Sequence, residues 1–293
     1  VENDFNLKEA EVKLIDDVSA AFHAKGKKVI VIINAGGVIE TVSWRDKVDA
    51  ILLAWQPGLE AGNAVADVVS GKVTPSGKLA TTFPVKYDDD VTAKNFPGIE
   101  FPEKATTGML GMKAVPAEVT YEEGVYVGYR YYNTFNIKPA YEFGYGLSYT
   151  NFNYSNLVLS ANTFDKNITA TVTITNTGKI AGKEVVQLYL SSPQDKLDKP
   201  SAELKAFGKT GLLQPGKSGK ISFILRPEDL ASFNTATTSW IADAGTYTIK
   251  VGSSSLNIKQ TASFQLPKDV TTEKVNKVIS PQVPINETRK KPF

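Results

Sequence analysis

The sequence predicts an α/β part followed by an all-β sandwich, and two patterns support this fold class. The N-terminal part alternates between helical and strand periodicity, whereas the C-terminal part consists of short alternating runs separated by turn residues. Alternating helices and strands indicate a mainly parallel sheet, and consecutive short strands indicate a sandwich. The 293-residue length also favours two domains over one.

The α/β part is predicted to cover residues 1–118 and to be incomplete at its N-terminus. Asn6 can cap a first helix that runs to about Ala24, with Glu9 completing a capping box. Apolar, β-branched runs at 28–33 and 49–55 predict strands buried on both faces. Further patterns predict a helix at 58–69 and a third strand at 79–85. A helix that begins near Asn6 needs a preceding strand for its sheet, and this sequence provides none.

Residues 86–118 are predicted to form a long loop, because helix and strand periodicity both fail there. A loop longer than about 15 residues in a compact protein is usually functional or disordered. The apolar residues Phe96, Phe101 and Met109 fit disorder poorly and indicate a pocket rim or a contact with a partner subunit. We interpret the acidic run 88–90 as a solvated turn. Residues 119–150, rich in aromatics and turn glycines, are predicted to link the two domains.

The sandwich is predicted to cover residues 151–267 and to be followed by an extended tail at 268–293. Alternating runs predict seven strands at 152–159, 168–175, 184–190, 203–213, 219–225, 245–252 and 258–266. Because the chain has no cysteine, the fibronectin type III-like form is favoured over the disulfide-bonded immunoglobulin form. Trp240 is expected in or beside the core. The aromatics expected to face inward are Tyr189, Phe207, Phe223 and Tyr247.

Composition excludes several classes of function. A net charge of +2 without a basic face argues against nucleic-acid binding. No apolar run reaches the roughly 18 residues that a membrane span needs. The single histidine, His23, and the absence of cysteine leave no His/Cys metal site. The turn at 36–37 is not followed by a helix start, so it is no phosphate-binding fingerprint, and we expect no cofactor.

Candidate polar residues follow the predicted parallel strands. Asn34, Glu40 and Glu60 all belong to the carboxyl-terminal edge of the sheet, where open α/β folds bind ligands. Glu60 falls in the first turn of a helix, where a carboxylate interacts favourably with the helix dipole. We interpret both glutamates as structural, with Asn34 and Glu60 also able to contact a ligand.

Several motifs then occur in a fixed order along residues 3–266. They lie at 27–37, 54–64, 75–84, 121–130 and 143–149. In this order and spacing the chain resembles the C-terminal portion of glycoside hydrolase family 3, the retaining β-glucosidases and β-xylosidases. It departs at Leu59-Glu60-Ala61-Gly62, where the family more often has Gln-Glu-Gly-Gly, which loosens the backbone packing expected there.

The resemblance implies a part of a retaining β-glucosidase that acts on a β-glucoside or oligosaccharide. The nucleophile would lie in an N-terminal TIM-like barrel and the general acid on a loop just before residue 3, so Glu2 is assigned no role and this chain holds no catalytic residue. By itself the chain would be inactive. The resemblance also implies a partner half that carries the barrel and a periplasmic or secreted location. It further implies that residues 96–112 lie near the aglycone site or a homodimer contact.

Two other classes of function remain open at this point. The sandwich could serve a non-catalytic protein that binds carbohydrate or a partner, which would need an exposed row of aromatics at alternate strand positions. It could also serve only stability and dimerisation. Fold alone does not separate these functions, because function resides in sites; the order of the motifs favours the glycosidase.

Overall fold

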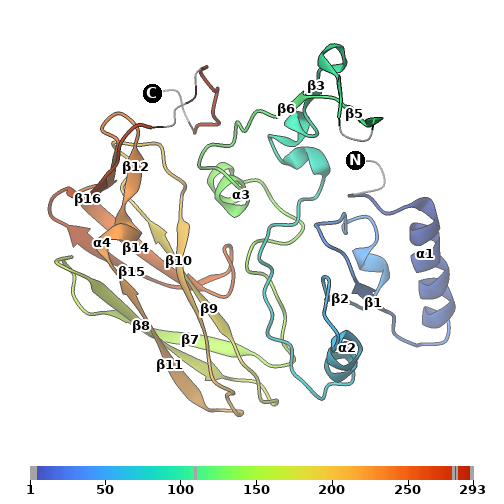
Figure 1. The fold of residues 1–293 in the computed structure, drawn as a ribbon. Helices are drawn as coiled ribbons and strands as arrows, with labels where there is room; N and C mark the ends of the chain where they lie inside the picture. Colours follow the sequence, from blue (N-terminus) through green and yellow to red (C-terminus); the bar gives the residue numbers. More distant parts are fainter. Residues whose placement is uncertain (1–4, 109–110, 279–280, 282, 291–293) are drawn as a thin grey trace.

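The computed structural model describes residues 5–108, 111–278, 281 and 283–290, and these form an α/β part and a β-sandwich (Figure 1). In Figure 1 the sandwich lies on the left and the α/β part on the right, with the helix α3 between them. This arrangement confirms the predicted fold class, α/β followed by all-β. Within the described ranges, no helix is long and apolar enough to cross a membrane.

The α/β part is built around a parallel pair of strands. Its elements are α1 (Glu9–His23), β1 (Ile30–Ile33), the 3-10 helix η1 (Arg45–Lys47), β2 (Ala50–Leu53) and α2 (Ala61–Val69). The two strands pair in parallel along their whole length, from Ile30↔Ala50 to Ile33↔Leu53. The predicted order of helix, strand, strand and helix is therefore present, with shorter strands than the apolar runs suggested.

The first helix starts later than its sequence pattern predicts. The residue before it is Lys8, whose backbone N–H donates to the Glu11 carboxylate at 2.9 Å. This bond satisfies one of the free N–H groups at the helix start. The prediction that Asn6 caps the helix with Glu9 is therefore wrong, because the glutamate two positions further on closes the first turn.

Two predictions about the strands are also wrong. Ile30 and Ile32 are 44% and 47% exposed rather than buried, because the sheet formed by the described residues consists of β1 and β2 alone. Residues 79–85 form no strand. Instead, Phe83 makes an isolated antiparallel bridge with Tyr141, and its N–H donates to the Tyr141 carbonyl at 2.8 Å. The segment therefore pairs with the interdomain linker and not with the parallel sheet.

Residues 86–118 contain more regular structure than the predicted loop. The 3-10 helices are η2 (Tyr87–Asp89), η3 (Ala93–Asn95) and η4 (Pro102–Lys104), and the strands are β3 (Ile99–Glu100), β4 (Thr106–Thr107), β5 (Lys113–Ala114) and β6 (Ala117–Glu118). β3 pairs with β6 and β4 with β5, both antiparallel. We call residues 96–118 the arm; in Figure 1 it projects at the upper right. Backbone pairing, rather than a hydrophobic core, holds its limbs together.

The linker contains a helix that the sequence analysis did not predict. This helix, α3 (Tyr129–Phe135), begins after Gly128 and ends at Asn136, both of which have positive φ values of 57°. The Tyr129 ring lies 4.8 Å from that of Phe143, tilted by 31°, and meets the edge of Tyr189 from the sandwich at 5.8 Å. Its hydroxyl accepts the backbone N–H of Leu204 at 2.7 Å. The linker aromatics therefore fasten α3 to the sandwich.

The sandwich contains all seven predicted strands. They are β7 (Phe152–Leu159), β8 (Ile168–Asn176), β9 (Val185–Ser191), β10 (Glu203–Lys209), β11 (Ser218–Leu225), β14 (Gly245–Gly252) and β15 (Ile258–Leu266). One sheet has the order β10-β9-β14-β15 and the facing sheet β11-β8-β7. Side chains that are almost fully buried, among them Ile168, Leu188 and Tyr247, fill the space between the sheets. Alternation of inward and outward residues along each strand explains why these positions were predictable.

A small third sheet was not predicted. It has the order β12-β13-β16, with β12 at Ser232–Asn234, β13 at Ser239–Ala242 and β16 at Val270–Lys274, and a short helix α4 (Pro227–Leu230) precedes it. The residues predicted as the start of an extended tail thus form a paired strand. Trp240 lies on β13 and is 41% exposed, with its ring 5.4 Å from that of Phe233. It therefore belongs to this outer sheet and not to the core.

One of the four predicted inward-facing aromatics is wrong. Tyr189, Phe223 and Tyr247 are buried, but Phe207 is 71% exposed. A register shift in β10 between Leu204 and Ala206 changes which side chains face the core. A β-bulge has this effect because it breaks the strict alternation of a strand.

Candidate functional site

The loops that follow β1 and β2 leave the sheet at one edge. The strands are parallel and in register, and Ala54 continues the pairing by donating its N–H to the Ile33 carbonyl at 2.9 Å. Asn34 and Ala54 therefore both emerge at the carboxyl-terminal edge, as predicted, and the side chain of Asn34 is exposed. A Cβ on Gly36 would lie 2.9 Å from the Gln56 side-chain nitrogen, so the two loops pack directly on each other. Open α/β sheets bind ligands at this edge.

Glu60 lies next to this edge and bonds within its own helix start. It is the residue immediately before α2, it is exposed, and its carboxylate accepts the side-chain amide of Asn63 at 2.5 Å. Its carbonyl accepts the Ala64 N–H at 2.9 Å, the first bond of the helix. These bonds place Glu60 at the start of α2.

Glu40 closes a turn that supports a buried tryptophan. Its carboxylate accepts the N–H and the hydroxyl of Ser43, at 2.8 and 2.6 Å. The indole N–H of Trp44, which is 1% exposed, donates to the Glu40 carbonyl at 2.8 Å. The Glu40 N–H donates to the Phe5 carbonyl at 2.8 Å, which holds the N-terminal segment across this turn. Both carboxylate oxygens are therefore engaged locally.

The turn at Glu40 forms one side of an open groove of about 650 Å³. The groove is lined by Asn6, Leu7, Val12, Glu40, Ser43, Val85, Lys86, Tyr87 and Asp88. The Phe5 and Tyr87 rings, with centroids 5.9 Å apart, connect its N-terminal side to η2. The groove lies between the loop after β1 and the segment that starts at residue 85. Polar groups from these separate segments therefore face the same hollow. We regard it as the candidate functional site.

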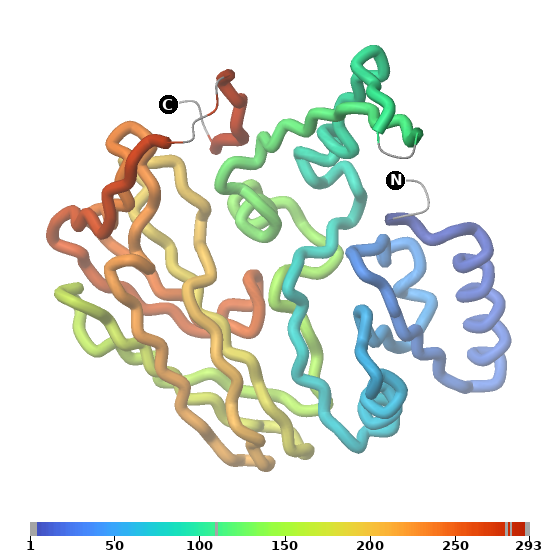
Figure 2. Tube along the Cα trace, viewed as in Figure 1, coloured from blue at the N-terminus to red at the C-terminus, as the bar shows by residue number. Residues whose placement is uncertain are grey.

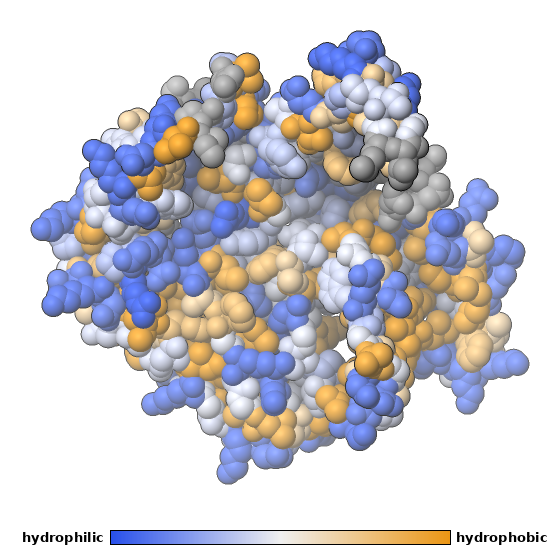
Figure 3. Space-filling model, viewed as in Figure 1, coloured by the Kyte–Doolittle hydropathy of each residue, from blue (hydrophilic) through white to orange (hydrophobic). Residues whose placement is uncertain are grey.

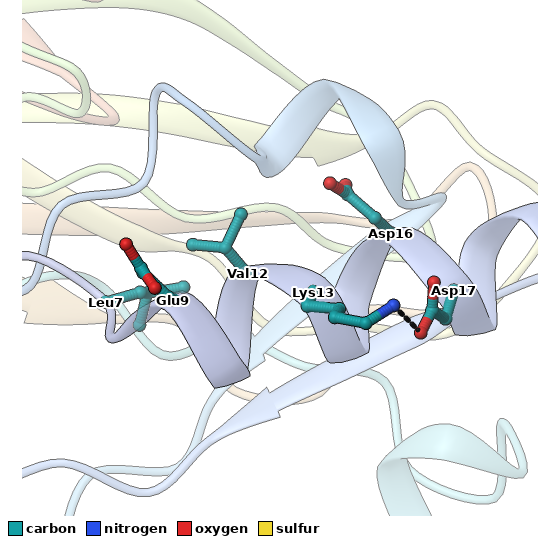
Figure 4. Close-up of a pocket in the computed structure, with 6 residues that line it drawn as sticks. All are labelled: Leu7, Glu9, Val12, Lys13, Asp16 and Asp17. Carbon is teal, nitrogen blue, oxygen red and sulfur yellow. Dashed lines mark hydrogen bonds and ion pairs between the residues drawn. The ribbon is translucent and has the colours of Figure 1, made fainter.

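A second hollow, of about 440 Å³, lies on the side of α1 (Figure 4). It is lined by Leu7, Glu9, Val12, Lys13, Asp16 and Asp17. Lys13 and Asp17 are one helical turn apart and pair at 2.7 Å, and this hydrogen bond raises the pKa of Lys13. Exposed pairs of this kind contribute little to stability or recognition. The hollow therefore reflects the solvated face of a helix, and the groove at Glu40 remains the candidate.

An aromatic path fixes the loop after β2 to the linker. Trp55 has a left-handed backbone conformation, with φ at 55°, and its ring lies 6.2 Å from that of Phe83. Phe83 is 2% exposed and meets Tyr141 at 6.2 Å. The Arg45 guanidinium lies 5.3 Å from the Tyr141 ring and donates to the Ala140 carbonyl at 3.0 Å. The sequence analysis did not single out Trp55; the available signal was a tryptophan directly after a buried-type strand.

The lone histidine lies away from the groove. His23 and Asp49 approach at 2.8 Å, and Asp49 also accepts from the Lys28 ammonium and the Val29 N–H. These bonds, that of Lys28 foremost, hold the pKa of Asp49 far below its usual value. Asp49 precedes β2 and Val29 precedes β1, so the cluster lies at the opposite edge of the sheet from Asn34. It is a structural cluster, and within the described ranges no group of His, Cys, Asp and Glu could hold a metal ion.

The two predicted arm residues that the structure describes, Phe96 and Phe101, have different surroundings. Phe96 is 66% exposed at the start of the arm, whereas the Phe101 ring is partly covered by the Lys104 ammonium, 4.2 Å from its centroid. Met109 lies outside the described residues. At the base of the arm, Asn95 donates to the Thr120 carbonyl and the Glu122 carboxylate at 3.1 and 3.0 Å. The arm is therefore anchored at its base, with an exposed aromatic beside the anchor.

Comparison with known proteins extends this description over both parts. Residues 2–129 match the glycosyl hydrolase family 3 C-terminal domain, and residues 184–255 match a fibronectin type III-like domain. Beta-glucosidase 3B from Thermotoga neapolitana, solved in complex with α-D-glucose, superposes with a TM-score of 0.83 at 49% identity. That match covers 93% of this chain and 36% of the solved chain. The chain belongs to glycoside hydrolase family 3.

Two curated relatives show the same coverage. Beta-glucosidase A of Butyrivibrio fibrisolvens is 37% identical over 96% of this chain and 34% of its own length. Exo-alpha-(1->6)-L-arabinopyranosidase of Bifidobacterium longum is 35% identical over 90% of this chain and 32% of its own length. The chain thus spans about a third of the length of the relatives it matches, and it carries the C-terminal domain of the family together with the fibronectin type III-like domain.

Proposed function

We propose that this chain is the C-terminal part of a retaining β-glucosidase that removes terminal β-D-glucosyl residues from glucosides or oligosaccharides. The observation that carries the proposal is the similarity to a named β-glucosidase across 96% of the chain. The similarity includes the α/β part, the linker and the sandwich together, so it does not rest on a common fold alone.

The catalytic carboxylates are assigned to the remainder of the enzyme. Retaining hydrolysis needs two carboxyl groups about 5 Å apart, one acting as nucleophile and one as general acid. The two glutamates at the sheet edge do not fit, because Glu40 is bonded to Ser43 and Glu60 to Asn63. This chain would supply the scaffold beside the acid-bearing loop and one wall of the pocket, with Asn34 and the groove at Glu40 nearest to it.

The exposed apolar surface of the α/β part supports a partner that carries the barrel. Leu14, Phe22, Ile30 and Ile32 are each between 44% and 62% exposed. Figure 3 shows hydrophobic patches over this side of the molecule. Exposed apolar patches are typical of interaction sites. We assign it to the N-terminal half of the enzyme, in the same chain or a separate one.

The arm is proposed to form part of the pocket wall or of a homodimer contact. Phe96, Ile99 and Met112 are each about two-thirds exposed, at 66%, 69% and 65%, on a segment held in shape by two strand ladders. An aromatic beside a rigid anchor can pack on the apolar face of a sugar ring at little entropic cost.

The test combines intact mass with turnover of chromogenic substrates, namely a β-D-glucoside, a β-D-xyloside and an α-L-arabinopyranoside. We expect turnover of the β-D-glucoside only when a barrel-sized segment is present in the preparation. Phe96→Ala should raise KM several-fold with little change in kcat, whereas Phe207→Ala, an equally exposed phenylalanine on the sandwich, should change neither. Turnover by a lone 31.8 kDa species would refute the assignment of the catalytic carboxylates.

One observation favours a second candidate, a non-catalytic carbohydrate-binding role for the sandwich. Trp240 and Phe233 form an exposed aromatic pair, 41% and 38% accessible, on the outer sheet. Retardation of the chain in a gel containing a soluble β-glucan, abolished by Trp240→Ala in a preparation without turnover, would favour this role over the glycosidase.

A further inference from the structure

The end of the chain returns to the linker that carries the arm. Figure 2 shows the red C-terminal segment beside the green segment that leads from the arm to α3. The Thr288 N–H donates to the Glu122 carbonyl at 2.7 Å. The Glu287 side chain lies over Gly124, where a Cβ would be 3.4 Å from the glutamate carboxyl carbon. The last described residues therefore contact the linker directly, a few residues after the arm ends.

The same segment is also bound to the sandwich. The Lys290 N–H donates to the Asp198 carboxylate at 3.1 Å, and the Lys290 ammonium lies 3.5 Å from the other oxygen of that carboxylate. The ammonium also donates to the Gln194 side chain. Asp198 is largely buried, with 14% of its side chain exposed, so this pair is less screened than a surface pair. Residues 194 and 198 belong to the loop between β9 and β10.

Asp198 links the tail to the linker as well. It accepts the Tyr126 hydroxyl at 2.5 Å, and Tyr126 is 2% exposed against Phe135 of α3. Burial, followed by the bond to Asp198, raises the pKa of Tyr126. One carboxylate thus joins three segments: the tail, the sandwich loop and the linker.

Glu122 likewise joins several segments, at the base of the arm. Its carboxylate accepts from Asn95 at 3.0 Å and lies 3.5 Å from the Lys94 ammonium, and the Asn95 bond lowers the pKa of Glu122. Its carbonyl accepts from the tail. Glu122 therefore ties together the residues just before the arm, those just after it and the tail.

We propose that residues 285–290 are a clasp that fixes the base of the arm to the sandwich, so that losing the C-terminus loosens the arm without unfolding either part. The geometry supports this, because two short ladders pair the described residues of the arm, while Glu122 at its base is bonded to the tail. Clipping of the C-terminus by a protease would then change the order of the arm.

Hydrogen–deuterium exchange of the protein in its native assembly tests the clasp. The reporter is the Tyr126 amide, which donates to the Glu123 carbonyl at 2.9 Å within the linker. A chain ending at residue 284 should exchange there about tenfold faster, since a charge-assisted hydrogen bond contributes on that order to a local opening equilibrium. Lys290→Ala should give a smaller increase, and Arg289→Ala, its exposed neighbour, should give none.

Two further measurements make the outcome decisive. Limited proteolysis should cut the arm, residues 96–118, several-fold faster in the shortened chain than in the parent, while the sandwich strands keep their exchange rates. If the shortened chain does not fold, the same two measurements are made on Lys290→Ala and on its control, Arg289→Ala. Equal exchange at Tyr126 and equal cleavage of the arm in the parent and the variants would overturn the proposal.

Discussion

Substitution of Gly144 by alanine should weaken the packing of the linker against the sandwich and lower the stability of the protein. Gly144 has a left-handed backbone, with φ at +82°, and a Cβ there would lie 2.7 Å from the amide carbon of Gln187. Gln187 is 3% exposed in β9, so its side chain has little room to move. Its amide donates to the carbonyls of Gly144 and Ser253, at 3.2 and 2.7 Å, and accepts the Tyr189 hydroxyl at 2.6 Å.

The expected destabilisation follows from these contacts. A side chain in the left-handed region costs about 1 kcal/mol. Displacing Gln187 leaves buried groups unpaired, each at a cost of about 1–3 kcal/mol. With at least one such group stranded and the steric overlap added, Gly144→Ala should lower the free energy of unfolding by about 4 kcal/mol.

Chemical denaturation followed by tyrosine and tryptophan fluorescence measures this loss. Gly37→Ala is the matched control, because a Cβ on Gly37 would meet no heavy atom within 4 Å, and it should change stability by less than about 0.5 kcal/mol. The double variant Gly144→Ala/Gln187→Ala should be more stable than the sum of the single variants predicts, since removing Gln187 relieves the overlap. A loss below about 1 kcal/mol for Gly144→Ala would refute the reasoning.

Two more perturbations test the ion pairs of the structure. Lys78→Met should cost about 3–5 kcal/mol in denaturant unfolding, because it leaves Glu184, 10% exposed and paired at 3.1 Å, without its cation. The paired change Lys78→Met/Glu184→Leu should recover most of this loss, and no recovery would contradict the role of the pair. At the edge of the β1–β2 sheet opposite Asn34, the pKa of Asp49 is lowered on folding, first by Lys28 and then by the Val29 N–H and His23. Its contribution to stability is therefore complete above the unfolded pKa, about 3.9, and is lost as pH falls towards the lower folded value. The protection factors of the β1 and β2 amides, taken relative to the intrinsic exchange rate at each pH, should fall below about pH 4. Asp49→Asn should flatten this dependence, and an unchanged profile in the variant would rule Asp49 out as its source.

The sandwich was predictable because its signal is local. Alternating burial repeats every second residue, and the strands at 152–159, 245–252 and 258–266 begin and end where the sequence indicated. Failures occurred where a tertiary feature breaks the alternation. The register shift in β10 turns Phe207 outward, and Trp240 lies in a third sheet whose strands are too short to show a pattern.

The candidate site was only partly predictable, for a different reason. The edge position of Asn34 follows from parallel strands and was foreseen. The groove at Glu40 depends on contacts between residues far apart in sequence, such as the tilted contact between the Phe5 and Tyr87 rings. The clasp joins Glu122 to Thr288 and Asp198 to Lys290, and no periodicity reports such pairs.

The two parts of the chain also differ in how completely each buries its own apolar side chains. The sandwich encloses side chains such as Ile168, Val172 and Leu188 at 0% exposure, so its core is covered by its own strands. β1 instead presents Ile30 and Ile32 to solvent, each more than 40% exposed. Exposed apolar area forgoes roughly 25 cal/mol per Å² of stabilisation. The α/β part should therefore be the first to loosen on heating, unless a further surface covers β1, whereas the sandwich needs no such cover. Phe83 of the α/β part packs against Tyr141 of the linker and pairs with it. A substitution at the junction between linker and sandwich should therefore also destabilise the α/β part, although β1 lies at a distance from it.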